Sequence, residues 1–441
     1  MSEPESPEPA PGRESRRAAL ELLRGVLRKH RTLEDAIGHT PRWRNLEARD
    51  RAFARHLAAT TLRRLGQLDA VIARCLDRPL KPKLAAVQDL LRLGAAQVLF
   101  MDTPAHAAVG ETVALAVGVR VGAHRNLLNA VLRRIAREGD SLLDGLDAPH
   151  LNTPDWLWQG WTAAYGEATA RAIAEQHMQE PPLDFTVVEQ TDREAWRERL
   201  GARELPMGTL RLPPGTRDPR RLPGYDDGAW WVQDAAAGLP PKLLGEVRGK
   251  RVVELCAAPG GKTAQLVAQG AEVLAVDRST ERLRQLVDNL NRLSLGAATV
   301  AADVTQWQPP EKLENILLDA PCTATGTLRR HPDIARLKQP ADVPAMAELQ
   351  MALLRSAARM LAPGGTLVYA VCSLEPTEGV ELVDTLLAEH GDIERVPVDP
   401  AEIGGLPEAV TAAGDVRTLP HHLGEQGGLD AFYIARLRRS A

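Results

Sequence analysis

Hydrophobic residues in the first part of the chain recur at the spacing of amphipathic helices. In "SRRAALELLRGVLRKH", Ala18, Leu22 and Val26 repeat every four residues, with arginines on the other face. The segments "KLAAVQDLLRLGAAQVLFM", "PAHAAVGETVALAVGV" and "RNLLNAVLRRIAREG" repeat the pattern, and Pro104 and Gly139 are placed to begin one helix and end another. The pattern predicts an all-α domain over residues 13–140.

The pattern changes from about Lys250, where short apolar runs alternate with amphipathic segments. We expect strands at "KRVVELC", "AEVLAVD", "ATVAAD", "ENILLDAP" and "GTLVYAVC", with helices such as "GGKTAQLVAQ" and "TERLRQLVDNLNRL" between them. This alternation is typical of a parallel, doubly wound sheet, whose ligands bind beyond the carboxyl ends of the strands. Residues 229–441 are therefore expected to form a Rossmann-like α/β domain.

Two further segments complete the predicted organisation. Residues 151–228 contain "PPLDFTVVEQ" and "GTLRLPPG", which favour short strands around a helical "DREAWRERLG", and we expect a small α+β connector there. Residues 1–12 are acidic and rich in proline, without the layout of a signal peptide, and are expected to be a disordered tail.

Charge is unevenly distributed along the chain. Residues 13–138 hold 24 Lys and Arg against 12 Asp and Glu, a net charge of +12, whereas the whole chain carries −4. A basic module joined to an acidic one suggests that nucleic acid binds the basic face, although a solvated arginine-rich helical surface would give the same count.

The chain has four cysteines and no apolar run long enough for a membrane span. The cysteines form no CxxC pair and have no metal-ligand spacing, so we expect a reduced, cytoplasmic protein without a metal and without membrane contact. We also expect a monomer.

The loop in "VVELCAAPGGKTAQL" lies between a predicted strand and a predicted helix, where glycines and free helical N–H groups favour a polar ligand. A phosphate loop would need glycine where Cys256 stands, and G-x-G-x-x-G is absent. Asp277, 16 residues after Gly261, can accept both ribose hydroxyls of an adenosine ligand, and Asp303, after the next strand, can accept from an adenine amino group. Together these features favour S-adenosyl-L-methionine.

Two cysteines follow neighbouring predicted strands, Cys322 in "LLDAPCTATGTLRRHPD" and Cys372 in "YAVCSLEPTEG". A lone cysteine is usually structural, but two thiols at adjacent strand ends beside a methyl donor suggest chemistry. Carbon 5 of a pyrimidine becomes nucleophilic when a thiolate adds to carbon 6, and an acid such as Asp319 can stabilise the charge that develops on the ring. The residues alone leave open which thiol adds and which assists release.

The motifs "ELCAAPGGKT", "DAPCTATGTLRRHPD" and "YAVCSLEPTE" resemble the RNA cytosine-5 methyltransferases of the NOL1/NOP2/Sun class, and the helical region is similar to NusB-type RNA-binding domains. The combination of these motifs with a NusB-like helical region resembles bacterial RsmB (Sun) small-subunit rRNA methyltransferases and implies a class I methyltransferase domain. By this resemblance Cys372 is the nucleophile, Cys322 assists release, Asp319 lies at the reacting face and Lys262 lies near the base or Asp319. The resemblance assigns the methyl donor to Cys256, Ala257, Ala258, Pro259, Gly260, Gly261, Lys262, Asp277, Asp303 and Asp319, and RNA to Arg329, Arg330 and His331.

Three positions depart from the family's pattern: Val371 stands where Thr is frequent, Asp184 near where a basic residue might contact RNA, and Gly379 where Asn is common. Two alternatives stay open, a tRNA substrate and a non-catalytic NusB-like RNA-binding factor. The expected function is methylation of carbon 5 of a cytosine in small-subunit rRNA.

Overall fold

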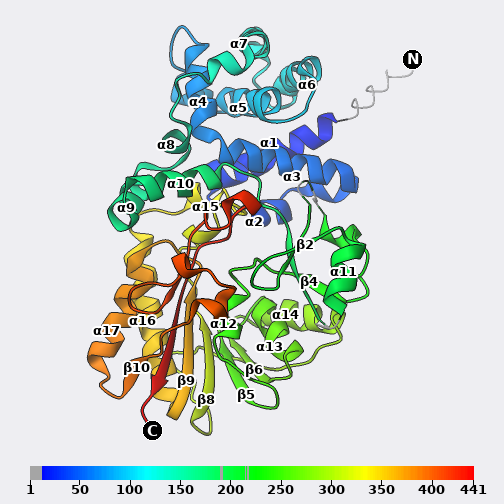
Figure 1. The fold of residues 1–441 in the computed structure, drawn as a ribbon. Helices are drawn as coiled ribbons and strands as arrows, with labels where there is room; N and C mark the ends of the chain where they lie inside the picture. The colour runs from blue at the N-terminus through cyan, green and yellow to red at the C-terminus, as the bar shows by residue number, and fades with distance from the viewer. Residues whose placement is uncertain (1–11, 189–191, 214, 216–217) are drawn as a thin grey trace. The chain divides into compact units, whose positions relative to one another are not determined.

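The computed structural model describes residues 12–188, 192–213, 215 and 218–441, which fall into two compact units (Figure 1). The first unit ends at Gln159 and also contains the distant segment His331–Lys338. The second unit consists of Gly160–Arg330 and Gln339–Ala441. The expected disordered tail lies, apart from Gly12, outside the described residues.

The first unit is helical, as the hydrophobic spacing predicts. Ala18, Leu22 and Val26 are fully buried in its apolar core, so the predicted face of the first helix is the one that packs. The segment His331–Lys338 joins this unit because the Leu33 N–H donates to Asp333 Oδ2 at 2.9 Å and Leu337 packs against the same core. Its helices are α1 (Arg13–Lys29), α2 (Leu33–Gly38), α3 (Ala48–Arg63), α4 (Leu65–Arg74), α5 (Ala85–Phe100), α6 (Ala105–Gly118), α7 (Arg125–Glu138), α8 (Ala148–Asn152) and α15 (Ile334–Leu337).

The predicted connector, residues 151–228, contributes β1, β2 and β3 to a small antiparallel sheet in the order β2-β3-β1-β4, and the fourth strand, β4, lies just beyond residue 228. Phe185 and Trp230 are fully buried and pack with their ring centroids 5.1 Å apart, which gives this sheet its own core. The elements, with two preceding helices, are α9 (Asp155–Tyr165), α10 (Glu167–His177), β1 (Asp184–Val187), α11 (Arg193–Arg199), β2 (Arg203–Glu204), β3 (Leu210–Arg211) and β4 (Trp230–Val232).

The large sheet has the strand order β10-β12-β9-β8-β5-β6-β7, with β11 paired to β12. The five strands from β5 to β9 are parallel, so their carboxyl ends meet at one edge, while β12 runs antiparallel beside β9. The strands are β5 (Arg251–Leu255), β6 (Glu272–Asp277), β7 (Ala298–Ala301), β8 (Leu313–Asp319), β9 (Leu361–Val371), β10 (Ile393–Arg395), β11 (Val416–Thr418) and β12 (Phe432–Arg439).

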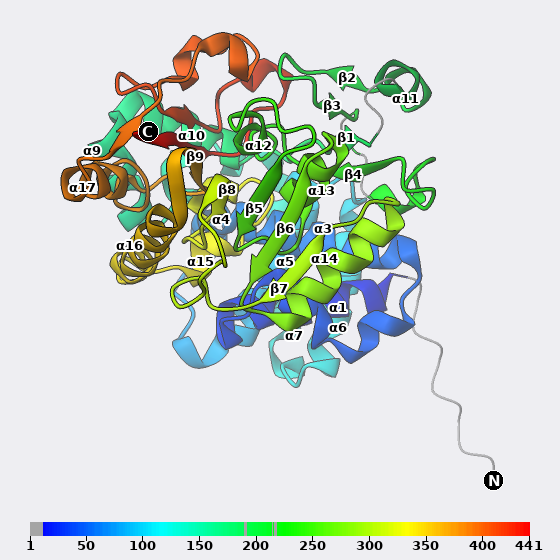
Figure 2. The same ribbon diagram turned by 90° about the horizontal axis from the view of Figure 1, so that it is seen from below.

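Helices cover both faces of this sheet (Figure 2). Successive strand residues alternate between the faces: Ile316 and Leu318 pack toward α16 and α17, whereas Leu317 packs toward α12 and α13. The predicted doubly wound α/β domain is thus confirmed. Its helices are α12 (Leu239–Lys242), α13 (Gly261–Ala268), α14 (Thr280–Arg292), α16 (Asp342–Met360) and α17 (Val380–Glu389).

Candidate active site

The loop between β5 and α13 has the backbone that close approach of a ligand requires. Cys256 and Gly260 both adopt positive φ, of 61° and 97°, so the chain turns sharply before α13 begins at Gly261. A Cβ at Gly260 would lie 2.6 Å from Leu286 Cγ, whereas one at Gly261 would meet nothing within 4 Å. Gly260 therefore allows close packing on α14, and Gly261 leaves open space at the first turn of α13.

Two carboxylates end the next strands, as the sequence predicts. Asp277, at the end of β6, is 3% exposed; its Oδ1 accepts from the Ser279 N–H at 2.9 Å and its Oδ2 from the Ala258 N–H at 3.2 Å. Asp303 follows β7 and is exposed, and hydrogen bonds from Thr305 lower the pKa of its carboxyl group. Each carboxylate group keeps at least one oxygen that can accept from a hydroxyl or amino group, so the two acids fit a nucleoside such as the adenosine part of S-adenosylmethionine.

A lysine and an aspartate pair where β8 ends. The Lys262 ammonium group donates to Asp319 Oδ2 at 2.6 Å, and its Nζ lies 5.2 Å from the centre of the Phe432 ring. Burial disfavours the charge on Lys262, which is 8% exposed, but Asp319 outweighs burial and raises the pKa of the lysine. Lys262 is therefore a charged side chain, and an ion pair holds it at the edge of the sheet.

The two cysteines that follow β8 and β9 converge. Cys322 Sγ lies 3.5 Å from Cys372 Sγ, and both side chains are partly exposed. The hydrogen bond to Cys372, followed by burial, raises the pKa of the Cys322 thiol. Cys372 also interacts electrostatically with Lys262. The two thiols, Lys262 and Asp319 thus form one cluster, which we name the thiol cluster.

Backbone contacts lock the two cysteine loops together. The Gly326 N–H donates to the Cys372 carbonyl at 3.0 Å, and the Gly326 carbonyl accepts from the Ala431 N–H at 2.9 Å. A Cβ at Gly326 would lie 2.1 Å from the Ala431 carbonyl oxygen, so only glycine fits between these segments.

One acid at this edge of the sheet was not predicted. Glu254 of β5 is 1% exposed and accepts from Thr263 Oγ1 at 2.5 Å, and burial raises the pKa of its carboxyl group to about 8. Asp319 adds to this rise, so Glu254 is near the thiol cluster. The signal was available, because "VVELC" places a single acid in an otherwise apolar strand, where a buried carboxylate is costly.

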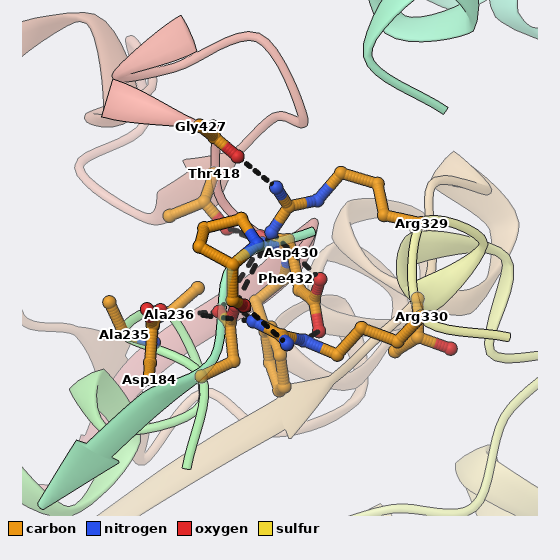
Figure 3. A network of polar contacts seen from close by, with 12 residues as sticks. Asp184, Ala235, Ala236, Arg329, Arg330, Thr418, Gly427, Asp430 and Phe432 are labelled. Carbon is orange, nitrogen blue, oxygen red and sulfur yellow. Dashed lines mark hydrogen bonds and ion pairs between the residues drawn. The ribbon is translucent and has the colours of Figure 1, made fainter. Parts of the chain in front are cut away.

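The arginines that are expected over RNA also have partners within the chain. Arg329 is 1% exposed, and it and Arg330 donate to Asp234 and Asp430, as Figure 3 shows around Asp430. Two buried carboxylates require such compensation, so these guanidinium groups stabilise the loop that carries Cys322. His331 belongs to the helical unit.

The three departures from the family pattern also have structural settings. Asp184 is fully buried and forms a bidentate ion pair with Arg211, with both N–O distances 2.7 Å, so it anchors the small sheet. Val371 is fully buried in β9. A Cβ at Gly379 would lie 2.9 Å from the Tyr433 ring, which favours glycine there.

Among the described residues, no helix is both long and apolar enough to cross a membrane, and no group of three or more His, Cys, Asp and Glu side chains could hold a metal ion.

Comparison with known proteins agrees with this architecture. Residues 241–438 match the family model of the 16S rRNA methyltransferase RsmB/F, and residues 13–137 match that of the NusB family. Proteins named ribosomal RNA small subunit methyltransferase B are 37% identical over 97% of this chain and 97% of the relative in Pseudomonas syringae, and 36% identical over 97% and 98% in Pseudomonas putida.

Solved structures share the fold. The crystal structure of PH0851 has a TM-score of 0.73 and 21% identity and covers 98% of this chain and 99% of that one. A methyltransferase homologue from Pyrococcus horikoshii has a TM-score of 0.52 and 26% identity over 68% of this chain and 98% of its own. The chain is a methyltransferase and belongs to the RsmB/F family of 16S rRNA methyltransferases, with a NusB-family domain at its amino-terminal end.

Proposed function

We propose that this enzyme methylates carbon 5 of a cytosine in small-subunit rRNA, with S-adenosylmethionine as methyl donor and a covalent bond between Cys372 and the base. The observation that carries the proposal is the 3.5 Å separation of the two cysteine sulfurs beside the Lys262–Asp319 pair. Methylation of an exocyclic amine would need no thiol, whereas carbon 5 must first be activated by a nucleophile at carbon 6.

The donor would be held by the loop from Cys256 to Lys262, by Asp277 on the ribose and by Asp303 on the adenine, at the carboxyl ends of β5, β6 and β7. When bound, S-adenosylmethionine supplies an electrophilic methyl group on its sulfonium sulfur. The neighbouring residues set its orientation, because Asp277 is fixed by two backbone N–H groups.

The electrostatics favour Cys372 as the nucleophile. Cys372 interacts with the cationic Lys262 side chain, whereas the hydrogen bond to Cys372 and burial raise the pKa of the Cys322 thiol. Addition of the Cys372 sulfur to carbon 6 pushes electrons into the ring, and the Lys262–Asp319 pair supplies the proton that Asp319 passes to the ring nitrogen on which negative charge develops. After carbon 5 is methylated, a base removes its proton, the bond between sulfur and carbon 6 breaks, and Cys322 assists the departure of Cys372.

Two features favour small-subunit rRNA as the substrate: the positive charge of the helical unit and the substrate named for the relatives. Residues 13–138 carry a net charge of +12, which suits RNA phosphates, and the named relatives act on small-subunit rRNA. The target base would be splayed from its stack to reach the thiol cluster. Cytoplasmic location and a monomeric state stay predictions.

The test is methyl transfer from labelled S-adenosylmethionine to small-subunit rRNA from a strain that lacks this gene, followed by mapping of the modified base. We expect label on carbon 5 of a cytosine in that rRNA. Label on a different atom, label only on tRNA, or no transfer to RNA would contradict the proposal.

A further inference from the structure

One buried carboxylate contacts the residue that follows each cysteine. The Glu378 Oε1 atom accepts from the Thr323 backbone N–H at 2.8 Å, and Oε2 accepts from the Thr323 and Ser373 hydroxyl groups. Thr323 follows Cys322, and Ser373 follows Cys372. The same side chain therefore holds both cysteine loops.

The surroundings of Glu378 fix it firmly. It is fully buried in the short 3-10 helix η8 (Pro376–Glu378), and its Oε1 also accepts from Gln350 Nε2 at 3.0 Å. Gln350 Nε2 donates in addition to the Pro321 carbonyl at 2.9 Å, and Tyr369 donates its hydroxyl to the Glu378 carbonyl at 2.7 Å. The two carboxylate oxygens thus accept four hydrogen bonds, which fills the capacity of the group.

We propose that Glu378 is a positioning residue that sets the spacing of the Cys322 and Cys372 sulfurs, so that both reach one pyrimidine. The inference rests on the proposed function for the reason why the two sulfurs must lie close together. The contacts of the Glu378 carboxylate with both loops do not depend on that function. A site that must hold two reacting groups within a fraction of an ångström needs side chains that are themselves locked by hydrogen bonds, and one carboxylate, that of Glu378, accepts hydrogen bonds from both loops.

The hydrogen bond to Cys372, burial and, less strongly, the Glu378 carboxylate raise the pKa of the Cys322 thiol.

The test measures thiol spacing in the full-length protein without RNA or S-adenosylmethionine. Dibromobimane fluoresces when it bridges two thiols, and its bridging rate is divided by the rate of single alkylation by monobromobimane, which corrects for changed reactivity. We expect Glu378→Ala to lower this ratio about tenfold because four hydrogen bonds to a charged acceptor are lost. Glu378→Gln should stay within about threefold of the native ratio, because its amide oxygen still accepts and the hydroxyl groups can turn to accept from its NH₂ group.

Two control variants and one alternative test variant make the result specific. Cys322→Ser should abolish bridging, which shows that the signal comes from this pair. Glu381→Ala, at an exposed position in the first turn of α17, should leave the ratio unchanged. If Glu378→Ala does not fold, Thr323→Val keeps the shape of the threonine but removes one hydroxyl donor, and it should lower the ratio about threefold.

An unchanged ratio in folded Glu378→Ala, or in Thr323→Val where Glu378→Ala does not fold, would overturn the positioning role, even if the native enzyme methylates RNA. Conversely, a native protein that methylates no RNA would refute the proposed function, while loss of bridging in Glu378→Ala would still support the positioning role. In an active enzyme, Glu378→Ala should lower kcat without raising KM for S-adenosylmethionine, because Glu378 contacts the thiol loops rather than the residues assigned to the donor.

Discussion

Replacing Glu254 by glutamine should change how the stability of the protein depends on pH. Burial raises the pKa of this carboxyl group from an ordinary value of 4.5 to about 8, although the hydrogen bond from Thr263 lowers it in part. The folded protein therefore holds Glu254 as a neutral acid at pH 7, whereas the unfolded chain holds it as a carboxylate. Glutamine has nearly the same shape, stays neutral at every pH and can still accept from Thr263 Oγ1.

The two pKa values set the size of the effect. At pH values between these two pKa values, the folded state binds one more proton than the unfolded state. The free energy of unfolding therefore falls by about 1.4 kcal/mol for each unit that the pH rises. Glu254 therefore lowers stability by about 2 kcal/mol at pH 6 and by about 4 kcal/mol at pH 8. The glutamine variant lacks this loss, and its advantage over the native protein should grow by about 2 kcal/mol from pH 6 to pH 8.

Unfolding in guanidinium chloride at pH 6, 7 and 8 measures this advantage as a difference between the two proteins, so that other titrating groups cancel. Glu272→Gln is a matched control, because Glu272 is exposed on the neighbouring strand β6, and its difference from the native protein should not vary with pH. A constant difference for Glu254→Gln would refute the reasoning, since it would mean that Glu254 is ionised in the folded protein.

Three further changes test the packing and the RNA assignment. Gly326→Ala should lower the free energy of unfolding, measured by thermal unfolding, by about 1–3 kcal/mol, because the added Cβ would lie 2.1 Å from a carbonyl oxygen. Gly391→Ala is the control, because a Cβ there has open space around it, and its stability should not change. If both variants lost the same stability, the close contact at Gly326 would be contradicted. Arg330→Met should lower the free energy of unfolding by about 3–5 kcal/mol, because it removes one of the two guanidinium groups that compensate the buried Asp234 and Asp430, and it should not change the salt dependence of RNA binding. A reduced salt dependence with native stability would instead place Arg330 on RNA. The double variant Lys81→Gln, Lys83→Gln, at exposed positions of the basic helical unit, should reduce the slope of log affinity against log salt by about 1.5, and an unchanged slope would exclude these lysines from the RNA contact.

Local sequence pattern was enough to predict the architecture, and it predicted that the acids and cysteines at successive strand ends lie at one edge of the sheet. Helical spacing identified the buried face of α1, and alternation of strands and helices identified the parallel sheet. Since parallel strands end at one edge, acids and thiols at successive strand ends had to lie near one another, and the convergence of Cys322 and Cys372 follows from the adjacency of β8 and β9.

Contacts between distant segments could not be predicted from such patterns. "TLRRHPD" looked like a basic loop over RNA, but the direction of Arg329 depends on Asp234 and Asp430, which are about a hundred residues away in the chain. In the same way, Glu378 gains its role from Thr323, 55 residues before it. Burial and pairing of charges are properties of the folded chain, and they decide whether a basic residue is a ligand or a structural support.

The roles of the two cysteines are tested most directly by incubating two variants with labelled small-subunit rRNA and S-adenosylmethionine, followed by denaturing electrophoresis. We expect Cys322→Ala to accumulate a covalent complex of protein and RNA that survives denaturation, because release is impaired, and Cys372→Ala to form no complex and no methylated product. Full methyl transfer by Cys372→Ala would contradict these roles.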